Sequence, residues 1–133
     1  MKLKALRRAY LREAAITLLL ARIAVRVIPA SRVFAWANRP RHRSGRFTAD
    51  EISWVLWSID AAADKSRTKP LCLPRALATH SMLRRRGIVS RICLGVARQR
   101  NEFAAHAWVE IGNDRVIADP SIRAFTRLAE FGG

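Results

Sequence analysis

The sequence predicts an α+β fold in which helices come first and a small antiparallel sheet follows. The first half of the chain is rich in Leu, Ala and Arg, which favour helices, and its apolar residues recur at helical spacing. After Gly87 the apolar residues alternate with a period of two, which is typical of strands. This order predicts helices packed on one side of a small sheet.

Four helices are expected. The first spans residues 3–28, and Pro29 ends or kinks it because its ring is incompatible with a helix interior. A short second helix runs from about 31 to 38. A third starts at the capping box of residues 48–51 and continues to about residue 64. The fourth carries the sequence LCLPRALATHSMLRRRG.

The ends of the fourth helix are marked by residue type. Pro74 suits the first turn, where its missing N–H is not needed, and Gly87 suits the position just after the last helical residue. The three consecutive arginines 84–86 lie at the negative end of the helix dipole. The helix is therefore expected to begin close to Cys72.

Three strands follow. Alternation predicts strands over residues 88–96, 103–111 and 115–118, with a hairpin turn at residues 112–114 between the last two. The tail, residues 120–133, is weakly patterned and is expected to hold a short helix.

The chain has 133 residues, which is the size of one domain. Residues 1–47 are expected to form a helical N-terminal segment that ends in a basic linker, and residues 48–133 the core. The apolar run from Ala14 to Ala21 is too short to cross a bilayer, which needs about 20 residues. Residues 1–28 are therefore expected to form an amphipathic helix that packs on the domain or lies on a partner or a membrane surface.

The chain is strongly basic, with a net charge of +15. Such a charge attracts nucleic acid, anionic lipid or acidic peptides. Arginine accounts for 21 of the 25 basic residues, which favours compositional bias over selection for phosphate contacts. No nucleic-acid motif is present and aromatic residues are not interleaved with the basic ones, so nucleic acid is not expected as a partner.

The chain has two cysteines, Cys72 and Cys93, which are too few for a disulfide scaffold. Free thiols in a reducing, cytoplasmic setting are the simpler prediction. Cys72 is the candidate nucleophile, because the positive end of a helix dipole and the unpaired N–H groups there favour a thiolate. Taken alone, a cysteine is also commonly a small buried apolar residue.

His106 is the candidate base. It lies in the strand FAAHAWVEI, where alternation places His106, Trp108 and Glu110 on one face. The small residues on both sides of His106 leave room for a second group to approach. Trp108 shares the face of His106 and is expected to line a substrate cleft. A core histidine satisfied by hydrogen bonds is the alternative for His106.

Asp119 is the candidate orienting group, because a carboxylate at the end of the next strand can reach an imidazole nitrogen and stabilise its protonated form. His106 follows Cys72 by 34 residues, and Asp119 follows His106 by 13. The order nucleophile, base and orienting carboxylate is typical of covalent catalysis by a cysteine. An Asp before Pro120 that opens a turn is the alternative.

No metal or cofactor is expected. A zinc site made from Cys72, Cys93, His80 and His106 would lack the short spacings that mark such sites. Cys93 alternates within an apolar strand and is expected in the core, and His80 is expected to pack or to be solvated.

Four sequence stretches together resemble a known family: CLPRAL at 72–77, LRRRGI at 83–88, FAAHAWVE at 103–110 and RVIAD at 115–119. They are similar to the transglutaminase-like leader peptidases of lasso-peptide biosynthesis, in the split form that acts with a separate leader-binding protein. The similarity covers roughly residues 50–120.

This resemblance implies a papain/transglutaminase-like core, with a Cys-bearing helix packed on a small antiparallel sheet. It implies a catalytic triad of Cys72, His106 and Asp119. It also implies a cysteine peptidase that removes the leader from a ribosomally made precursor peptide and frees the α-amine of the core peptide, which a separate cyclase then closes into a macrolactam. The implied partners are the precursor peptide, the leader-recognition protein and the lasso cyclase.

Two other functions remain open from the sequence. An acyltransferase on the same fold would use the same residues and differ only in accepting an amine in place of water. A non-catalytic basic module that binds nucleic acid or peptide would rest on the net charge and on arginines 84–86.

Overall fold

The computed structural model describes residues 2–37, 49–65, 72–99, 102–111, 114–115 and 126–132. The elements are α1 (Lys2–Val27), α2 (Ala30–Ala37), α3 (Ala49–Lys65), α4 (Cys72–Arg85), β1 (Arg91–Gln99), β2 (Glu102–Ile111), β3 (Asp114–Arg115) and β4 (Thr126–Gly132). The predicted α+β class is confirmed. Thr48, the first residue of the predicted capping box, lies outside the described residues.

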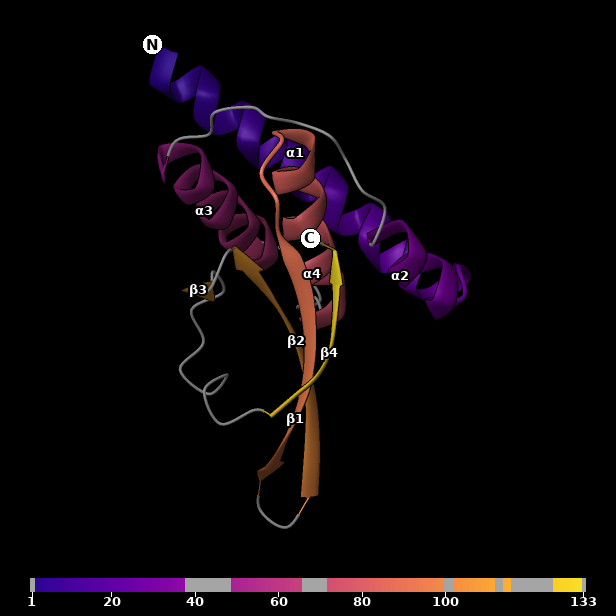
Figure 1. The fold of residues 1–133 in the computed structure, drawn as a ribbon. Helices are drawn as coiled ribbons and strands as arrows, with labels where there is room; N and C mark the ends of the chain where they lie inside the picture. Colours follow the sequence, from indigo (N-terminus) through magenta and orange to yellow (C-terminus); the bar gives the residue numbers. More distant parts are fainter. Residues whose placement is uncertain are drawn as a thin grey trace.

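The strands form one antiparallel sheet in the order β3-β2-β1-β4. In the central pair, Arg91 of β1 lies opposite Glu110 of β2, and Gly95 lies opposite His106. The helices gather around one end of the sheet, and the far ends of β1 and β2 extend beyond them (Figure 1).

Residues 126–132 of the tail form the strand β4 and not the short helix expected there, whereas residues 120–125 lie outside the described part of the chain. β4 pairs antiparallel with β1, with Ile92 opposite Phe131 and a register shift between Leu94 and Gly95. The pairing satisfies backbone groups along the edge of β1 that faces away from β2 and makes β1 an interior strand. The partner strand lies far earlier in the chain, so the local sequence of the tail does not reveal the pairing.

The end of α4 has the predicted glycine cap. Gly87 has a φ of 76°, a conformation that residues with a Cβ avoid. Its N–H donates to the carbonyl of Arg84 and the N–H of Ile88 donates to the carbonyl of Leu83, both at 3.0 Å. These two bonds form a Schellman motif. Because Ile88 completes the cap, β1 begins at Arg91 and not at residue 88 as predicted.

One hydrophobic core joins all the helices to the sheet. α4 lies at its centre and buries eight of its 14 residues. α1 contributes Tyr10, Ala14, Leu18 and Ala21, spaced three or four residues apart as one face of a helix requires. The described part of the N-terminal segment therefore packs on the remainder of the domain. The sheet contributes Ile92, Ala107 and Val109.

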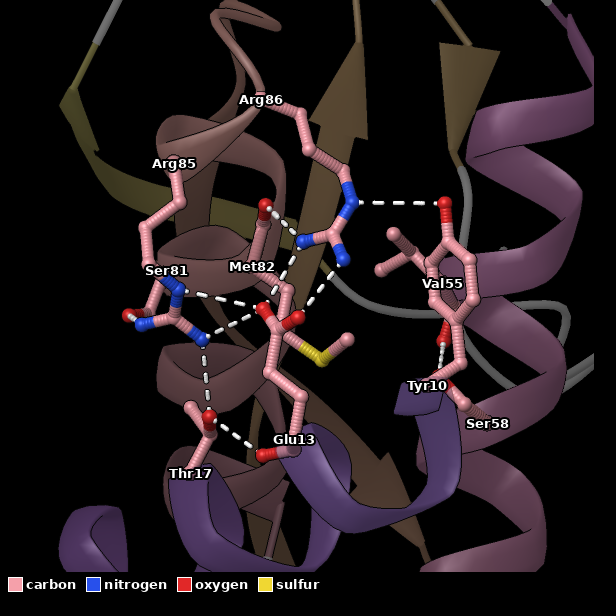
Figure 2. A network of polar contacts seen from close by, with 9 residues as sticks. All are labelled: Tyr10, Glu13, Thr17, Val55, Ser58, Ser81, Met82, Arg85 and Arg86. Atoms are coloured by element: carbon pink, nitrogen blue, oxygen red, sulfur yellow. Dashed lines mark hydrogen bonds and ion pairs between the residues drawn. The ribbon is translucent and has the colours of Figure 1, made fainter. Parts of the chain in front are cut away.

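A carboxylate on α1 binds the C-terminal end of α4. Glu13 accepts hydrogen bonds from both terminal nitrogens of Arg86, at 2.7 and 2.8 Å, and from Nε and Nη2 of Arg85, at 3.1 and 2.9 Å (Figure 2). Arg85 also donates to Thr17 on α1. Hydrogen bonding from Arg86 lowers the pKa of Glu13 below its usual value, and Arg85 lowers it further against the opposing effect of burial.

A row of aromatic rings continues this contact toward α3. The guanidinium of Arg86 lies 4.6 Å from the ring centre of Tyr10, which stacks on Trp54 at 5.7 Å. Trp54 meets Trp57 edge-on, and Arg7 lies over the ring of Trp57. Cation–π and aromatic pairs of this kind contribute about 1 kcal/mol each. They fix the position of α1 across α3 and α4.

His80 joins α4 to α2 and to the start of β1. Its Nε2 lies 3.3 Å from the carbonyl oxygen of Ala37, and its Nδ1 lies 2.7 Å from Oγ of Ser90. A carbonyl only accepts, so Nε2 carries the proton and Nδ1 accepts from the Ser90 hydroxyl. Burial lowers the pKa of His80 to about 4, the carbonyl of Ala37 opposes this shift, and the charge of Arg84 adds to it. The prediction of a packing role for His80 is confirmed.

In the part of the chain that the structure describes, every helix falls short of the length and apolarity needed to cross a membrane.

Glu13→Gln is expected to lower the free energy of unfolding at pH 7 by about 2 kcal/mol, because two arginines lose a partly buried carboxylate. The folded pKa of Glu13 lies below its unfolded value, so this stabilisation is present above about pH 4.5 and is lost as the pH falls through the folded pKa. Urea unfolding at several pH values measures it. Asp64→Asn, which removes an exposed carboxylate on α3, is the matched control. An equal loss in both variants would contradict the role of Glu13.

His80→Gln is expected to flatten the acid side of the stability curve. The folded pKa of about 4 lies below the unfolded value of 6.5, so the full stability is present above pH 6.5. Between pH 6.5 and pH 4, His80 binds a proton in the unfolded chain but not in the folded protein. This difference lowers the free energy of unfolding by up to about 3 kcal/mol. Thermal melting across this range compares the two slopes. Parallel curves for the wild type and the variant would show that His80 does not cause the pH dependence.

Candidate active site

Cys72 is the first residue of α4, and its side chain is half-buried. Pro74 occupies the first turn, as the sequence predicts, and is itself buried. Two residues fix the direction of α4 here: Leu73 packs against the core, and Arg75 forms an ion pair with Asp60 of α3. The thiol therefore sits at the N-terminal end of the most buried helix.

The sulfur of Cys72 lies against β2. The backbone N–H of Ala107 donates to Sγ at 3.3 Å. This N–H belongs to the peptide group that joins His106 to Ala107, so the thiol is next to the backbone of the candidate base. Among the described residues, β3 pairs with β2 only at Glu110 and Ile111. The start of α4 contacts β2 at Ala107, three residues before this pairing. The structure thus places the Cys72 thiol against the backbone of the strand that carries His106, 34 residues later in the chain.

His106 is half-buried on β2. Its cross-strand neighbour on β1 is Gly95, which has no side chain. Directly opposed residues in an antiparallel pair have Cβ atoms only about 5 Å apart, so a larger residue at this position would crowd the imidazole. The glycine leaves space beside His106 for a second group.

The alternation predicted for β2 is confirmed at its C-terminal half. Ala107, Val109 and Ile111 pack into the helical core, whereas Trp108 and Glu110 lie on the other face. The indole N–H of Trp108 donates to Oε2 of Glu110 at 2.8 Å.

Glu110 is the centre of a buried polar group. It is only 2% exposed, and Arg91, directly opposite on β1, donates to its Oε1 at 3.3 Å. Arg91 also lies 3.6 Å from a carboxylate oxygen of Glu130 on β4. These contacts join β2, β1 and β4 and hold the register that places Gly95 beside His106.

The structure does not support a cleft-lining role for Trp108. Its side chain is fully buried, with an exposed fraction of 0%, and its polar atom is used by Glu110. A ring without exposed surface has none to offer a substrate. Trp108 instead supports β2 two residues after His106.

Asp119 lies outside the described residues, and its role as the orienting carboxylate stays a prediction. Cys93 is fully buried, which confirms its predicted place in the core. Among the described residues no three His, Cys, Asp or Glu side chains converge as metal ligands, so Cys72, Cys93, His80 and His106 do not form the zinc site considered above.

Two features of the site were missing from the sequence prediction. The N–H that meets the thiol is a backbone group, and a backbone group leaves no signal in residue type. The pairing of Arg91 with Glu110 was visible only as opposite charges in two neighbouring strands, and their register became clear only with the structure.

A family model described as the transglutaminase-like superfamily matches residues 15–130. The match begins within α1 and ends within β4, so it includes both candidate residues that the structure places and the position of Asp119. No curated protein and no solved structure matches the chain.

The two thiols are expected to differ in reactivity because Cys72 is half-buried and Cys93 has no exposed surface. Iodoacetamide should label the folded protein once, at Cys72, and reach Cys93 only after unfolding. Mass spectrometry of the digested protein locates the label. Cys93→Ser should keep the labelling of the folded state and Cys72→Ser should lose it. Labelling of Cys93 in the folded protein at a similar rate would contradict this arrangement.

Proposed function

The chain belongs to the transglutaminase-like superfamily, and on this premise we propose that it is a cysteine peptidase that removes the leader from a ribosomally made lasso-peptide precursor. The observation that carries the proposal is the position of Cys72, at the start of α4 with its sulfur against the peptide group that follows His106. The resemblance of residues 72–77 and 103–110 to leader peptidases supports this substrate class.

In the proposed reaction the Cys72 thiolate attacks the carbonyl carbon of the scissile peptide bond. The C–N bond breaks as His106, in its protonated form, donates a proton to the departing amine. This leaves the leader as a thioester on Cys72. Water then adds to the acyl carbon, with His106 accepting its proton. The C–S bond breaks, so the leader departs as a free carboxylate and the Cys72 thiolate is restored. Asp119 would hold the imidazole in the orientation that both proton transfers need.

The start of α4 supports the same chemistry. The first N–H groups of a helix have no partner within the helix, and they point toward the end where Cys72 lies. Such groups are suited to receive the oxyanion that forms on the scissile carbonyl. The N–H of Ala107 holds the sulfur at the edge of β2, so that attack takes place beside the His106 strand.

The product of this step is a core peptide with a free α-amine, which a separate cyclase would join to a side-chain carboxylate to close the macrolactam. A separate leader-recognition protein would present the precursor. Acyl transfer to an amine would use the same residues, and the chemical form of the released leader distinguishes it from hydrolysis: a carboxylate for the peptidase and an amide for the transferase.

A basic binding module has less support, because arginines 84–86 are used inside the domain. Arg84 lies over the ring of Trp36 and donates to its carbonyl oxygen. Arg85 and Arg86 hold Glu13. The run of positive charge that suggested phosphate contacts is therefore a set of helix-docking contacts.

Cleavage of lasso precursor peptides, assayed with a leader-binding protein present, is expected to require Cys72 and His106. Cys72→Ala and His106→Ala should each lower the rate at least about 1,000-fold, and Asp119→Asn at least about tenfold. Chromatography with mass spectrometry follows the free leader.

Cys93→Ala is the matched control, because it removes the other thiol, and it should cleave at close to the wild-type rate. Cleavage that survives Cys72→Ala would refute the proposed nucleophile.

A further inference from the structure

The outward side of α1 carries a ridge of aliphatic side chains. Its members are Ile16, Leu19, Leu20, Ile23 and Val27, which we call the α1 ridge, and they are between 49% and 74% exposed. They recur every three or four residues, and the opposite side of the same helix carries the residues that pack into the core. Contiguous exposed apolar surface of this kind usually marks an interaction site.

Positive charge surrounds the α1 ridge. Arg12 and Arg26 each lie seven residues from Leu19, which is two helical turns, so the three side chains form one row. Arg12 and Arg26 are exposed, as are Arg8 one turn earlier and Arg32 on α2. Along the chain, Arg8 and Arg12 therefore precede the α1 ridge, Arg26 lies within it, and Arg32 follows it.

The two helices that carry these arginines have little negative charge of their own. Glu13 is the only acidic residue of α1, and its carboxylate is held by Arg85 and Arg86. α2 has no acidic residue at all. A surface that combines exposed aliphatic side chains with exposed arginines is complementary to an anionic, apolar partner.

A groove opens alongside the α1 ridge. It lies between α1, α2 and α4 and has a volume of about 500 Å³. Leu20 belongs to both ridge and groove. The other apolar walls come from Ala24, Ile28, Val33, Trp36 and Leu77. The groove is large and apolar enough to take part of a hydrocarbon chain beside the inserted ridge.

We infer that α1 docks the protein on the surface of an anionic lipid bilayer, with the α1 ridge inserted among the acyl chains and the arginines against the headgroups. The ridge is convex and purely aliphatic, which suits a fluid apolar phase. A protein interface relies more on aromatic anchors in fitted pockets. α1 would lie in the plane of the interface, since it is too highly charged to cross the membrane. This inference does not depend on the proposed peptidase activity.

The test is flotation of the full-length protein with vesicles of phosphatidylcholine alone and of phosphatidylcholine mixed with phosphatidylglycerol. The wild type should float with the anionic vesicles and much less with the neutral ones. Leu19→Gln combined with Ile23→Gln should weaken binding to anionic vesicles at least about tenfold. Ile16→Gln combined with Val27→Gln, at two further ridge positions, should do the same. All four side chains are exposed, so the circular dichroism of both variants should match the wild type.

Val89→Gln is the matched control, because Val89 is 53% exposed, lies between α4 and β1 and is not part of the α1 ridge. It should float like the wild type. Binding that is equally strong in the ridge variants would show attraction by net charge alone and overturn the inference. The wild type could also fail to float while the ridge variants lose only their capture by an acidic or leader-binding protein. That result would assign the α1 ridge to a protein partner and would also overturn the inference.

Discussion

The burial of α4 is the constraint on which the remainder of the structure depends. This helix is in contact with α1 and α3 on one side and with the sheet on the other, and eight of its 14 residues are buried. Its C-terminal end is fixed by the cap at Gly87 and by the carboxylate of Glu13. With that end fixed and the middle packed, the N-terminal end has one position available, and this position places Cys72 against β2.

Contacts within the sheet fix the strands that lie at the N-terminal end of α4. The ion pair between Arg91 and the buried Glu110 supports the register of β1 and β2, and this register places Gly95 beside His106. Trp108 contributes to the same buried group and so supports the strand from its far face. A polar group placed on the face opposite α4 thus helps to hold a candidate catalytic residue in position, although none of its members has been assigned to the chemistry.

Much of this arrangement was readable from the sequence, and the physical reasons are local. Pro74 and Gly87 mark the two ends of α4 because each has a backbone property that other residues lack. Alternation in β2 correctly separated Ala107 and Val109 from Trp108 and Glu110 on opposite faces. Contacts between distant segments were not readable. β4 forms by pairing with β1, and Glu13 binds arginines at the C-terminal end of α4. The thiol of Cys72 accepts from a backbone N–H. No local sequence pattern predicts any of these three contacts.

The central claim is that Cys72 and His106 act as a pair, and the most direct measurement is the rate of Cys72 alkylation as a function of pH in the wild type and in His106→Ala. A thiolate paired with an imidazolium reacts at about pH 6, where an isolated thiol is nearly inert. The account predicts rapid alkylation of the wild type at that pH and at least about tenfold slower alkylation of the variant. Identical profiles for the two proteins would contradict it, because Cys72 would then be a thiol that His106 does not influence.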